Sequence, residues 1–591
     1  MIDKILDQAA RHWRWVVLAA WIGLAAWMIV SSWSRILGFA LGDTDDNMRM
    51  SQVRALLEGQ AWFDLRQHKL DPPIGANIHW SRLVDLPLAA LILLFRPWIG
   101  GADAERAAIA IAPLIPYLLL VFSLSLTTRR LVDPRAFWLA ILALFFAGST
   151  NGMFAPTRID HHGWQLALVA LAVAGIADPK RARGGATLGV ASALSLTIGL
   201  EMIIYLAIGG VTTVLMWVDD RDQRRRLAAY AVTLAGGAAL GFLGFASYAN
   251  RLAVCDALSP VWLSDALVGG ALMLGLAMLS PRRVWVRFGL AAGAGVLIAG
   301  FHALMWPHCL TRLEGVSPEL YRVWLSHVRE ARPVYRHGWQ VATLIVALPL
   351  TAVFGWSLLA WRARADRDLL RRTLGVAAPA LIAGILLLWQ TRTGPAAQMM
   401  AIPGAIALAW FLAPMAFKSE RSLVRVLGTS AIVLLAIGGA VPLVTEFIPG
   451  KKSTPRQLAI GRANRLCNSM AGLHAVALQP AGMVFTFADI GPRLITVTHH
   501  TAVAGPYHRN GQAIEDVMHA FRGSEAQAQT LIGKYRSDYL LICPDMSTST
   551  IFMSETPEGF YAQLTKGQVP GWLTPVDLPK NSPFKMWKVR G

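Results

Sequence analysis

Long apolar stretches separated by short polar connections make up the first three quarters of the chain. Thirteen of them are roughly 20 residues long, which is the length that an α-helix needs to cross a bilayer. No side chain between Trp15 and Trp33 is charged. Because a cleaved signal peptide has a shorter apolar core, we interpret this first stretch as a retained span. The predicted spans lie near residues 15–33, 107–127, 136–154, 163–178, 186–200, 202–218, 227–249, 257–279, 286–305, 338–361, 373–390, 398–417 and 426–445.

Lys and Arg residues concentrate in alternate connections and therefore predict the topology. Seven basic segments fall on one side of the membrane only if the chain crosses it thirteen times, and basic loops face the cytoplasm. We expect a multi-pass protein of a bacterial inner membrane, with a cytoplasmic N-terminus. The segments contain Lys4, Arg11 and Arg14; Arg129, Arg130 and Arg135; Lys180, Arg181 and Arg183; Arg221, Arg224, Arg225 and Arg226; Arg282, Arg283 and Arg287; Arg362, Arg364, Arg367, Arg371 and Arg372; and Lys418, Arg421 and Arg425.

One further apolar run, from Leu83 to Gly100, does not fit this alternation. Counting it as a span would move every later basic segment to the opposite side, and it also contains Asp85, Pro87 and Arg96. We therefore predict a juxtamembrane helix near residues 83–100 that lies at the outer interface. This helix belongs to a large first external loop, residues 34–106, within a transmembrane domain of residues 1–445.

From about residue 446 the pattern changes to short alternating elements. Met483–Phe487, Leu494–Thr498 and Tyr539–Cys543 are typical of strands, whereas Asn510–Phe521 and Glu525–Tyr535 are typical of helices. Residues 446–591 therefore predict a C-terminal periplasmic α/β domain of ordinary size. The fold class is a polytopic α-helical membrane protein with about thirteen transmembrane helices and this appended domain.

Composition agrees with this pattern. Hydrophobic residues make up 55% of the 591 residues and charged residues only 15%, whereas a soluble domain has about 25% charged residues. The mean hydropathy is +0.45. The net charge of +19 would suggest nucleic acid in a soluble protein. Because the positive charge lies in short loops between spans, we expect no nucleic-acid partner.

Four cysteines are predicted to lie outside, where disulfides can form. Cys255 with Cys309 and Cys467 with Cys543 are the natural pairs, because each pair stays within one region. Four unpaired buried thiols are the alternative, and the sequence does not choose between the two.

Acidic and imidazole side chains gather in the predicted external loops. Asp43, Asp45 and Asp46 follow the first span, and Asp160-His161-His162 precedes the fourth. Carboxylates with imidazole suit a divalent metal such as Mg²⁺ or Mn²⁺, and ionisable groups at a membrane edge indicate function. Helix capping explains either group equally simply.

Two further polar motifs occur in later external loops. Glu330 stands in Val328-Arg329-Glu330-Ala331-Arg332-Pro333, and Arg392 follows the eleventh span. A surface ion pair with a neighbouring arginine is the simple explanation for Glu330, and Arg392 can be an interfacial arginine that extends its charge to water.

In order and spacing, these motifs resemble those of the GT-C glycosyltransferases, and most of all the catalytic subunit of oligosaccharyltransferase, including its archaeal form. The resemblance implies a GT-C-like transmembrane domain and a metal site formed by Asp43, Asp160 and His162. It maps the functional Glu of the family onto Glu330 and the arginine that binds the donor phosphate onto Arg392. His79 and Arg82 match the stretch that approaches the lipid phosphate in the family. The Trp-Trp-Asp motif that grips the sequon is missing, so the resemblance argues against asparagine-linked transfer to protein.

The resemblance implies a sugar donor on a polyprenyl phosphate or diphosphate and an acceptor that is a glycan, lipid or protein. The metal, Mn²⁺ or Mg²⁺, would neutralise the leaving phosphate, and Asp43 or Asp45 would take the proton of the acceptor hydroxyl. By analogy with the family, the reaction would invert the anomeric centre. In the C-terminal domain His499, His500, His508 and Arg509 can face the acceptor or serve the structure of their loops.

Two other classes of protein remain as alternatives. A secondary transporter would also have many spans, but it usually has internal repeats and mid-membrane polar sites. No repeat is visible, and Asp265 and His302 are the exceptions within the predicted spans. A non-catalytic scaffold of an envelope assembly is the third hypothesis.

Overall fold

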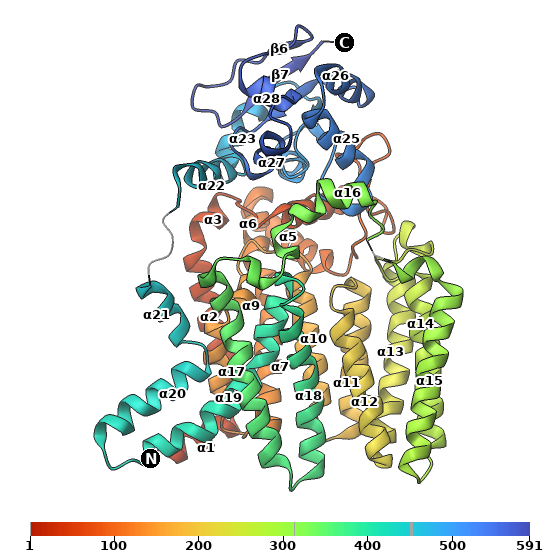
Figure 1. The fold of residues 1–591 in the computed structure, drawn as a ribbon, viewed down its shortest axis with the longest axis vertical. Helices are drawn as coiled ribbons and strands as arrows, with labels where there is room; N and C mark the ends of the chain where they lie inside the picture. The colour runs from red at the N-terminus through yellow and green to blue at the C-terminus, as the bar shows by residue number, and fades with distance from the viewer. Residues whose placement is uncertain (1, 312–313, 449–452, 591) are drawn as a thin grey trace.

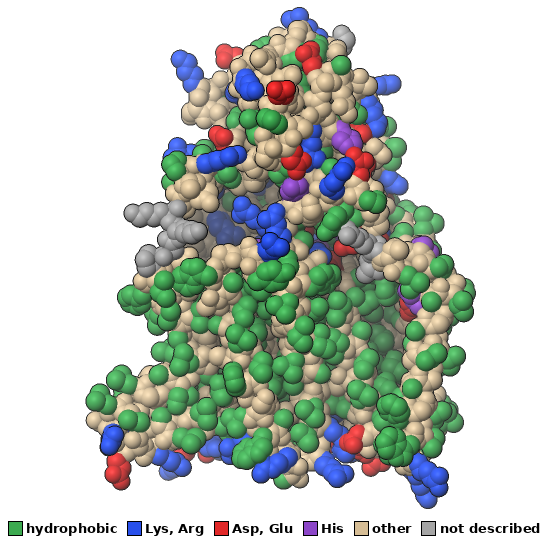
Figure 2. Space-filling model, viewed as in Figure 1, with side chains coloured by type: hydrophobic (Ala, Val, Ile, Leu, Met, Phe, Trp, Pro, Cys, Tyr) green, Lys and Arg blue, Asp and Glu red, His purple; other side chains and the backbone are tan. Residues whose placement is uncertain are grey.

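The computed structural model describes residues 2–311, 314–448 and 453–590. A bundle of long helices forms the lower part of the molecule, and an α/β region that contains the C-terminus lies at one end of it (Figure 1). Apolar side chains cover the bundle, whereas Lys and Arg side chains gather at its opposite end (Figure 2). This distribution is that of a multi-pass membrane protein, because lipid solvates the apolar sides and water solvates the charged ends.

Each of the thirteen predicted stretches contains a helix. By length and composition, eight of the described helical segments can cross a membrane, and a ninth candidate is a pair bent by 91° at its break. The count of thirteen therefore stays a prediction. The helices are α2 (Trp13–Ser31), α7 (Leu114–Leu131), α8 (Phe137–Phe146), α9 (Gly148–Gly152), α10 (His162–Ile176), α11 (Arg181–Ile198), α12 (Ile203–Asp219), α13 (Arg224–Phe245), α14 (Pro260–Leu279), α15 (Val284–Met305), α17 (Trp339–Ala363), α18 (Arg367–Leu386), α19 (Gly394–Phe417), α20 (Thr429–Ala436) and α21 (Ala440–Phe447).

The connection between α2 and α7 is folded and lies beneath the C-terminal region. It contains α3 (Trp33–Leu37), α4 (Thr44–Leu57), the two-stranded pair β1 (Arg66–Gln67) and β2 (Ala76–Asn77), α5 (Asp85–Ile99) and α6 (Gly101–Ile111). Helix α5 coincides with the predicted juxtamembrane helix, and its 15 residues are fewer than a span requires. One side of α5 is buried, while Leu93, Leu94 and Trp98 are exposed, as suits a helix at the membrane interface.

The C-terminal region is built on a five-stranded sheet of order β4-β3-β5-β7-β6. Strands β3, β4 and β5 are parallel, and β7 and β6 are antiparallel to their neighbours. The strands are β3 (Met483–Phe485), β4 (Thr501–Ala502), β5 (Tyr539–Ile542), β6 (Leu573–Pro575) and β7 (Lys585–Val589); the helices are α22 (Pro455–Cys467), α23 (Met470–Ala477), α24 (Gly491–Val497), α25 (Gly511–Arg522), α26 (Glu525–Lys534), α27 (Ser547–Glu555) and α28 (Phe560–Thr565).

The predicted strand at Leu494–Thr498 is wrong, because its first four residues belong to α24 and Thr498 is the C-cap of that helix. Pro492 stands in the first turn of this helix, where its fixed φ and missing N–H suit the start of a helix. The strand at Met483–Phe487 and the helices at Asn510–Phe521 and Glu525–Tyr535 are confirmed to within a few residues.

Helix α24 joins the C-terminal region to α4. Thr496 donates to the carbonyl of Asn47 at 2.9 Å, and Arg493 donates to the side-chain oxygen of Asn47 at 3.1 Å. Tyr507 donates to the carbonyl of Thr44 at 2.9 Å. Buried side chains of the first loop, such as Leu70, share one apolar core with the C-terminal sheet. The first turn of α4 is therefore fixed in place by residues of the C-terminal region.

The two cysteine pairs that the sequence favours both form disulfides: Cys255 with Cys309, and Cys467 with Cys543. The first joins the connection between α13 and α14 to the short helix η3 (Pro307–Leu310). The second joins α22 to the end of β5, within the C-terminal region.

Candidate functional site

The site begins at the first turn of α4. Asp43 is the N-cap of this helix, and its Oδ1 accepts from the backbone N–H of Asp45 at 2.9 Å and of Asp46 at 3.2 Å. The Asp46 carboxylate accepts in return from the Asp43 N–H at 2.9 Å, which completes a capping box. The capping role considered for Asp43 is therefore confirmed, and it fixes the direction of both carboxylates.

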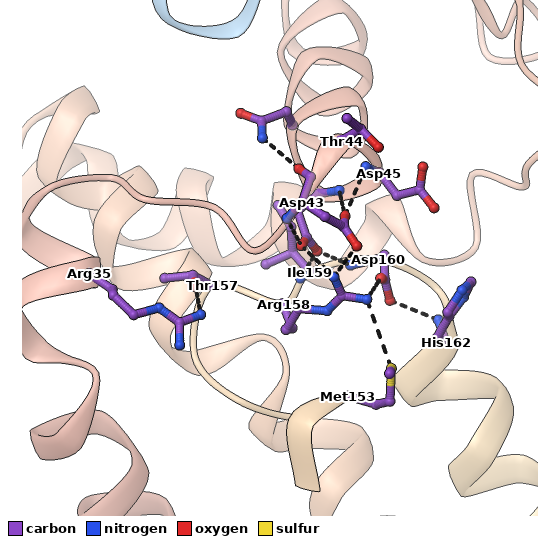
Figure 3. A network of polar contacts seen from close by, with 12 residues as sticks. Arg35, Asp43, Thr44, Asp45, Met153, Thr157, Arg158, Ile159, Asp160 and His162 are labelled. Carbon is purple, nitrogen blue, oxygen red and sulfur yellow. Dashed lines mark hydrogen bonds and ion pairs between the residues drawn. The ribbon is translucent and has the colours of Figure 1, made fainter. Parts of the chain in front are cut away.

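Asp46 also brings a second loop to this helix. Its Oδ1 accepts from the backbone N–H of Ile159 at 2.6 Å and of Asp160 at 2.9 Å. This fully buried carboxylate therefore connects two loops more than 100 residues apart in the chain and directs Asp160 toward Asp43 (Figure 3). The oxygens of Asp43, Asp46 and Asp160 approach one another within 4.8 Å.

The guanidinium of Arg158 lies among the three carboxylates. It donates to Asp160 Oδ2 at 2.5 Å, to Asp46 Oδ2 at 3.2 Å, and to Asp43 Oδ2. A side chain at Gly42 would collide with both Arg158 and Asp46, so only glycine allows this approach. Burial opposes ionisation of Asp160, but Arg158 together with His162 and His161 outweighs it and lowers the pKa of Asp160 from 3.8 to about 2.

The two histidines beside Asp160 face different partners. The backbone N–H of His162 donates to Asp160 Oδ1 at 2.9 Å, while its ring Nδ1 is buried and has no hydrogen-bond partner among the described residues. The Nε2 of His161 lies 2.8 Å from Glu201, which follows α11. A buried imidazole nitrogen without a partner, next to carboxylates, is available to a ligand.

A divalent metal fits this group of residues. Asp43 and Asp160 each keep one oxygen whose described partner is Arg158 alone, and His162 adds the unpaired Nδ1. Oxygen ligands with one imidazole suit Mn²⁺ or Mg²⁺, and the same set accepts Zn²⁺. The set of neighbouring ligand atoms differs from the prediction in one residue. The atoms that lie within 4.8 Å of one another come from Asp43, Asp160 and Asp46, rather than from Asp43, Asp160 and His162.

Asp45 lies beside this group but points away from Arg158 (Figure 3). Burial and the neighbouring Asp43 raise the pKa of Asp45 from 3.8 to about 8. A carboxyl group whose pKa is near neutrality can take up or release a proton.

Arg82, predicted to approach the donor phosphate, is fully buried below α4. All three of its guanidinium nitrogens donate to protein groups, including Asp85 at 3.2 Å and the carbonyl of Asp64 at 2.7 Å. Asp85 also accepts from Arg49 at 2.7 Å, so Arg82 and Arg49 together attach α4 to the start of α5. In this conformation Arg82 positions the loop and has no donor free for a ligand.

His79 lies in a second polar cluster, together with two of the residues predicted to face the acceptor. The Nε2 of His508 lies 2.6 Å from Asp256 Oδ2, and Arg509 donates to both oxygens of Asp256 at 2.6 and 2.7 Å. The rings of His79 and His508 are 4.5 Å apart. Burial and the neighbouring His508 hold the pKa of His79 well below its usual value, so this ring is neutral at pH 7.

The remaining predicted residues lie outside the acid cluster. His500 is buried, with its ring nitrogens 2.9 and 3.3 Å from the carbonyls of Val476 and Gly482, and His499 lies 2.8 Å from the carbonyl of Gln479. Both therefore serve the packing of the C-terminal region in this structure. Neither is in contact with the acid cluster among the described contacts.

Glu330 and Arg392 are both exposed, in neighbouring loops. Glu330 lies in η5 (Arg329–Ala331) and has no ion pair within residues 314–448, so the predicted alternative of a pair with an adjacent arginine is not formed. Arg392 lies in η7 (Thr391–Thr393), 3.9 Å from Glu314. The Thr391 N–H donates to the carbonyl of Arg332 at 2.8 Å, which joins the two loops.

Sequence reasoning missed three residues of these clusters, Arg158, Glu201 and Asp256, and it gave Asp46 no role of its own. The spacing of Asp43 and Asp46 is that of a capping box, which was a usable signal. Glu201 stands alone between two predicted spans, where an ionisable residue indicates function. Nothing local marks Asp256, because its partners lie far away in the sequence. Arg158 stands close to Asp160, but its contacts with Asp43 and Asp46 form only when two distant loops meet.

A membrane-spanning helical bundle with an α/β region over a carboxylate cluster defines the fold of this chain. The chain has the GT-C fold of membrane glycosyltransferases, and it is structurally similar to archaeal oligosaccharyltransferase. No protein-family model and no curated protein matches its sequence.

The structural similarity extends over most of the chain. The archaeal oligosaccharyltransferase AglB from Archaeoglobus fulgidus, solved with an inhibitory peptide and a dolichol-phosphate, matches with a TM-score of 0.67 and 16% identity over 97% of this chain and 75% of that chain. The same enzyme in complex with Zn and sulfate matches with a TM-score of 0.59 and 16% identity, over 89% of this chain and 67% of that one. ArnT from Cupriavidus metallidurans, bound to undecaprenyl phosphate, gives a TM-score of 0.48 and 13% identity over 97% of both chains.

Proposed function

We propose that this protein is a metal-dependent glycosyltransferase that transfers a sugar from a polyprenyl phosphate or diphosphate to a glycan, lipid or protein acceptor. The observation that carries the proposal is the approach of Asp43, Asp46 and Asp160 within 4.8 Å, beside the unpaired Nδ1 of His162. The fold supports it, because a similar fold binds dolichol-phosphate in AglB. A site between the helical bundle and the α/β region suits a donor whose lipid chain stays in the bilayer.

Asp43, Asp160 and His162 would hold the metal, and the complex of AglB with Zn and sulfate supports a cation site in this fold. When bound, the metal would neutralise the charge that develops on the leaving phosphate. Arg158, already beside these carboxylates, would then be free to donate to a phosphate oxygen.

Proton transfer is assigned to Asp45. Burial and Asp43 raise its pKa to about 8, so its ionised form is a strong base for the proton of an acceptor hydroxyl, and the share of this form increases as the pH rises toward 8. Asp43 is a poorer base, because its Oδ1 already accepts two backbone N–H groups and its Oδ2 is paired with Arg158. Arg392 and Glu330, exposed on neighbouring loops, would contact the donor phosphate and the acceptor. By analogy with the family, the reaction inverts the anomeric centre.

The test is transfer of radiolabelled sugar from a pool of polyprenyl-linked donors by purified protein, with and without Mn²⁺. We expect Asp160→Asn to lower transfer roughly a hundredfold or more, because the variant loses a charged oxygen at the centre of the site. Asp103→Asn is the matched control, since Asp103 is an exposed acid of α6 whose only described ion pair is with Arg106. Equal transfer by wild type and Asp160→Asn would overturn the proposal.

A further inference from the structure

A basic cavity lies at the end of the bundle farthest from the C-terminal region, where Figure 2 shows Lys and Arg side chains along the lower edge. Its volume is about 690 Å³, and it lies between the connection α10–α11, the connection α12–α13 and the first turn of α18. Two carboxylates line it, Asp222 and Asp368. The cationic lining residues are Lys180, Arg181, Arg183, Arg224 and Arg225.

The protein neutralises only part of this charge. Arg183 donates to Asp178 at 2.6 and 2.8 Å, and Arg181 lies 3.2 Å from Asp220 and 3.5 Å from Asp222. Lys180, Arg224 and Arg225 have no ion pair anywhere in residues 2–311, 314–448 or 453–590. Cations gathered around one cavity repel one another, and a bound anion would relieve that repulsion.

The neighbouring Arg226 has a structural role, unlike the arginines that line the cavity. Arg226 is buried, and its guanidinium donates to the carbonyls of Gly175 at 2.8 Å and Asp178 at 2.5 Å, which ties α13 to the end of α10. Arg224 and Arg225 make no such contacts and are exposed. Orientation of the chain in the membrane requires basic residues in these connections, but it does not require two connections to converge on one cavity.

The position of the cavity at the ends of the helices indicates which kind of anion it would bind. Its lining residues belong to the ends of membrane-crossing helices, which is the level of lipid headgroups. Leu215 of α12 and Leu374 of α18 are more than half exposed, and they lie about one and two turns from the ends of their helices at this side. An anion that carries acyl chains would therefore find cations in the cavity and exposed apolar side chains on two of the helices whose ends lie at this side.

From this arrangement we infer that the cavity binds the phosphate headgroup of an anionic phospholipid from the adjacent leaflet. Lys180, Arg224 and Arg225 supply the unpaired cations, and Arg181 can share its charge between Asp220 and the headgroup. Basic pockets between membrane helices bind such headgroups in this way. The site is at the opposite end of the bundle from Asp43, so it stands or falls independently of the proposed catalytic function.

The experiment measures binding of fluorescent short-chain phosphatidylglycerol to the purified full chain in a neutral detergent. We expect saturable binding that weakens with added salt, and at least a tenfold loss of affinity in the double variant R224Q/R225Q. The matched control is R282Q/R283Q, which removes the same charge from the connection α14–α15 outside the cavity. Lys180→Gln is a second, milder variant, and the thermal unfolding midpoint of each variant verifies that it is folded.

Two results would overturn the inference. Equal loss of affinity in R224Q/R225Q and R282Q/R283Q would mean that the lipid responds only to overall charge. Full competition by inorganic phosphate or pyrophosphate at concentrations similar to that of the lipid would instead assign the cavity to a soluble phosphate compound. Selective loss in R224Q/R225Q and Lys180→Gln, with weak competition by inorganic phosphate, would establish the lipid site.

Discussion

Three carboxylates within 4.8 Å of one another repel strongly unless a cation lies among them. In this structure Arg158 is that cation, and it contacts all three. A divalent metal at Asp43 and Asp160 would need the same oxygens. Arg158 and the metal therefore compete for the site, and the arginine lowers the apparent affinity for the metal.

This competition predicts that Arg158→Gln binds Mn²⁺ more tightly than the wild type, by roughly ten- to a hundredfold, because a positive charge is removed next to the ligands. Mn²⁺ titration followed by electron paramagnetic resonance measures this without any substrate. Arg35→Gln is the control, since Arg35 contacts Thr157 at 2.7 Å in the same loop but none of the acids. Unchanged or weaker Mn²⁺ binding by Arg158→Gln would contradict the competition.

Individual residues of the site were predictable to different degrees. Asp43 and Asp160 stand in acidic and imidazole motifs at loop ends, where ionisable residues are costly and informative. Arg158 was not predictable, because an arginine at a membrane edge is common and its role depends on two loops meeting. Arg82 was predicted to approach the lipid phosphate, and the structure does not favour this role. The sequence cannot distinguish a buried, fully paired guanidinium from an exposed one.

At the scale of elements, the C-terminal region is fastened to the helical bundle through the connection α13–α14. Asp256 pairs with both His508 and Arg509, and the adjacent Cys255 is held by its disulfide to Cys309. The side chains of Asp256 and Arg509 are each only 10% exposed. A paired charge with so little exposure is costly to break.

We predict that Asp256→Asn increases amide hydrogen exchange at η9 (His508–Asn510) and the start of α25, because it leaves Arg509 partly buried without a counter-charge. A loss of about 1–3 kcal/mol in local stability is expected. Glu319→Gln is the control, because its pair with His519 is exposed and contributes little. Equal exchange in Asp256→Asn and the wild type would refute the role of this contact.

The same contact has a defined pH dependence. Together, His508 and Arg509 outweigh the burial of Asp256 and hold the pKa of its carboxyl group well below the ordinary value of 3.8. Because the folded pKa is depressed, the contribution to stability is complete above about pH 4 and is lost only as the pH falls through the lower folded value. Protonation of Asp256 itself should therefore not reduce the exchange effect of Asp256→Asn between pH 5 and pH 8.

Elements with a long repeating pattern were predicted well, and short ones less so. Every predicted span contains a helix, because a continuous apolar run leaves few alternatives in a bilayer. Helix α24 was missed, because five apolar or β-branched residues at 494–498 fit a strand equally well. Its packing against α4, which decides the matter, lies outside the local sequence.

For the whole molecule, the last helical pair before the C-terminal region decides on which side of the membrane that region lies. The final helical pair, Val424–Ala436 and Ala440–Phe447, is bent by 91°. A pair with this bend can cross the membrane or return to the side from which it started. The thirteen-span topology requires that it crosses.

Cysteine labelling tests this topology, because the native cysteines are paired in disulfides. We expect Gln568→Cys to react with a membrane-impermeant maleimide in intact spheroplasts, since this residue is exposed in the C-terminal region. Glu420→Cys, exposed just before the bent pair, should react only after permeabilisation. Labelling of both variants in intact spheroplasts would mean that the bent pair does not cross.

The contacts of Arg493, Thr496 and Tyr507 with the first turn of α4 have a consequence for biogenesis. Residues 44–47 leave the ribosome hundreds of residues before the segment that completes their surroundings. A nascent chain can therefore insert all its helices while its acid cluster is still open on one side. A chain that stops before residue 493 would therefore have its helices in the membrane but would lack the contacts that hold the first turn of α4.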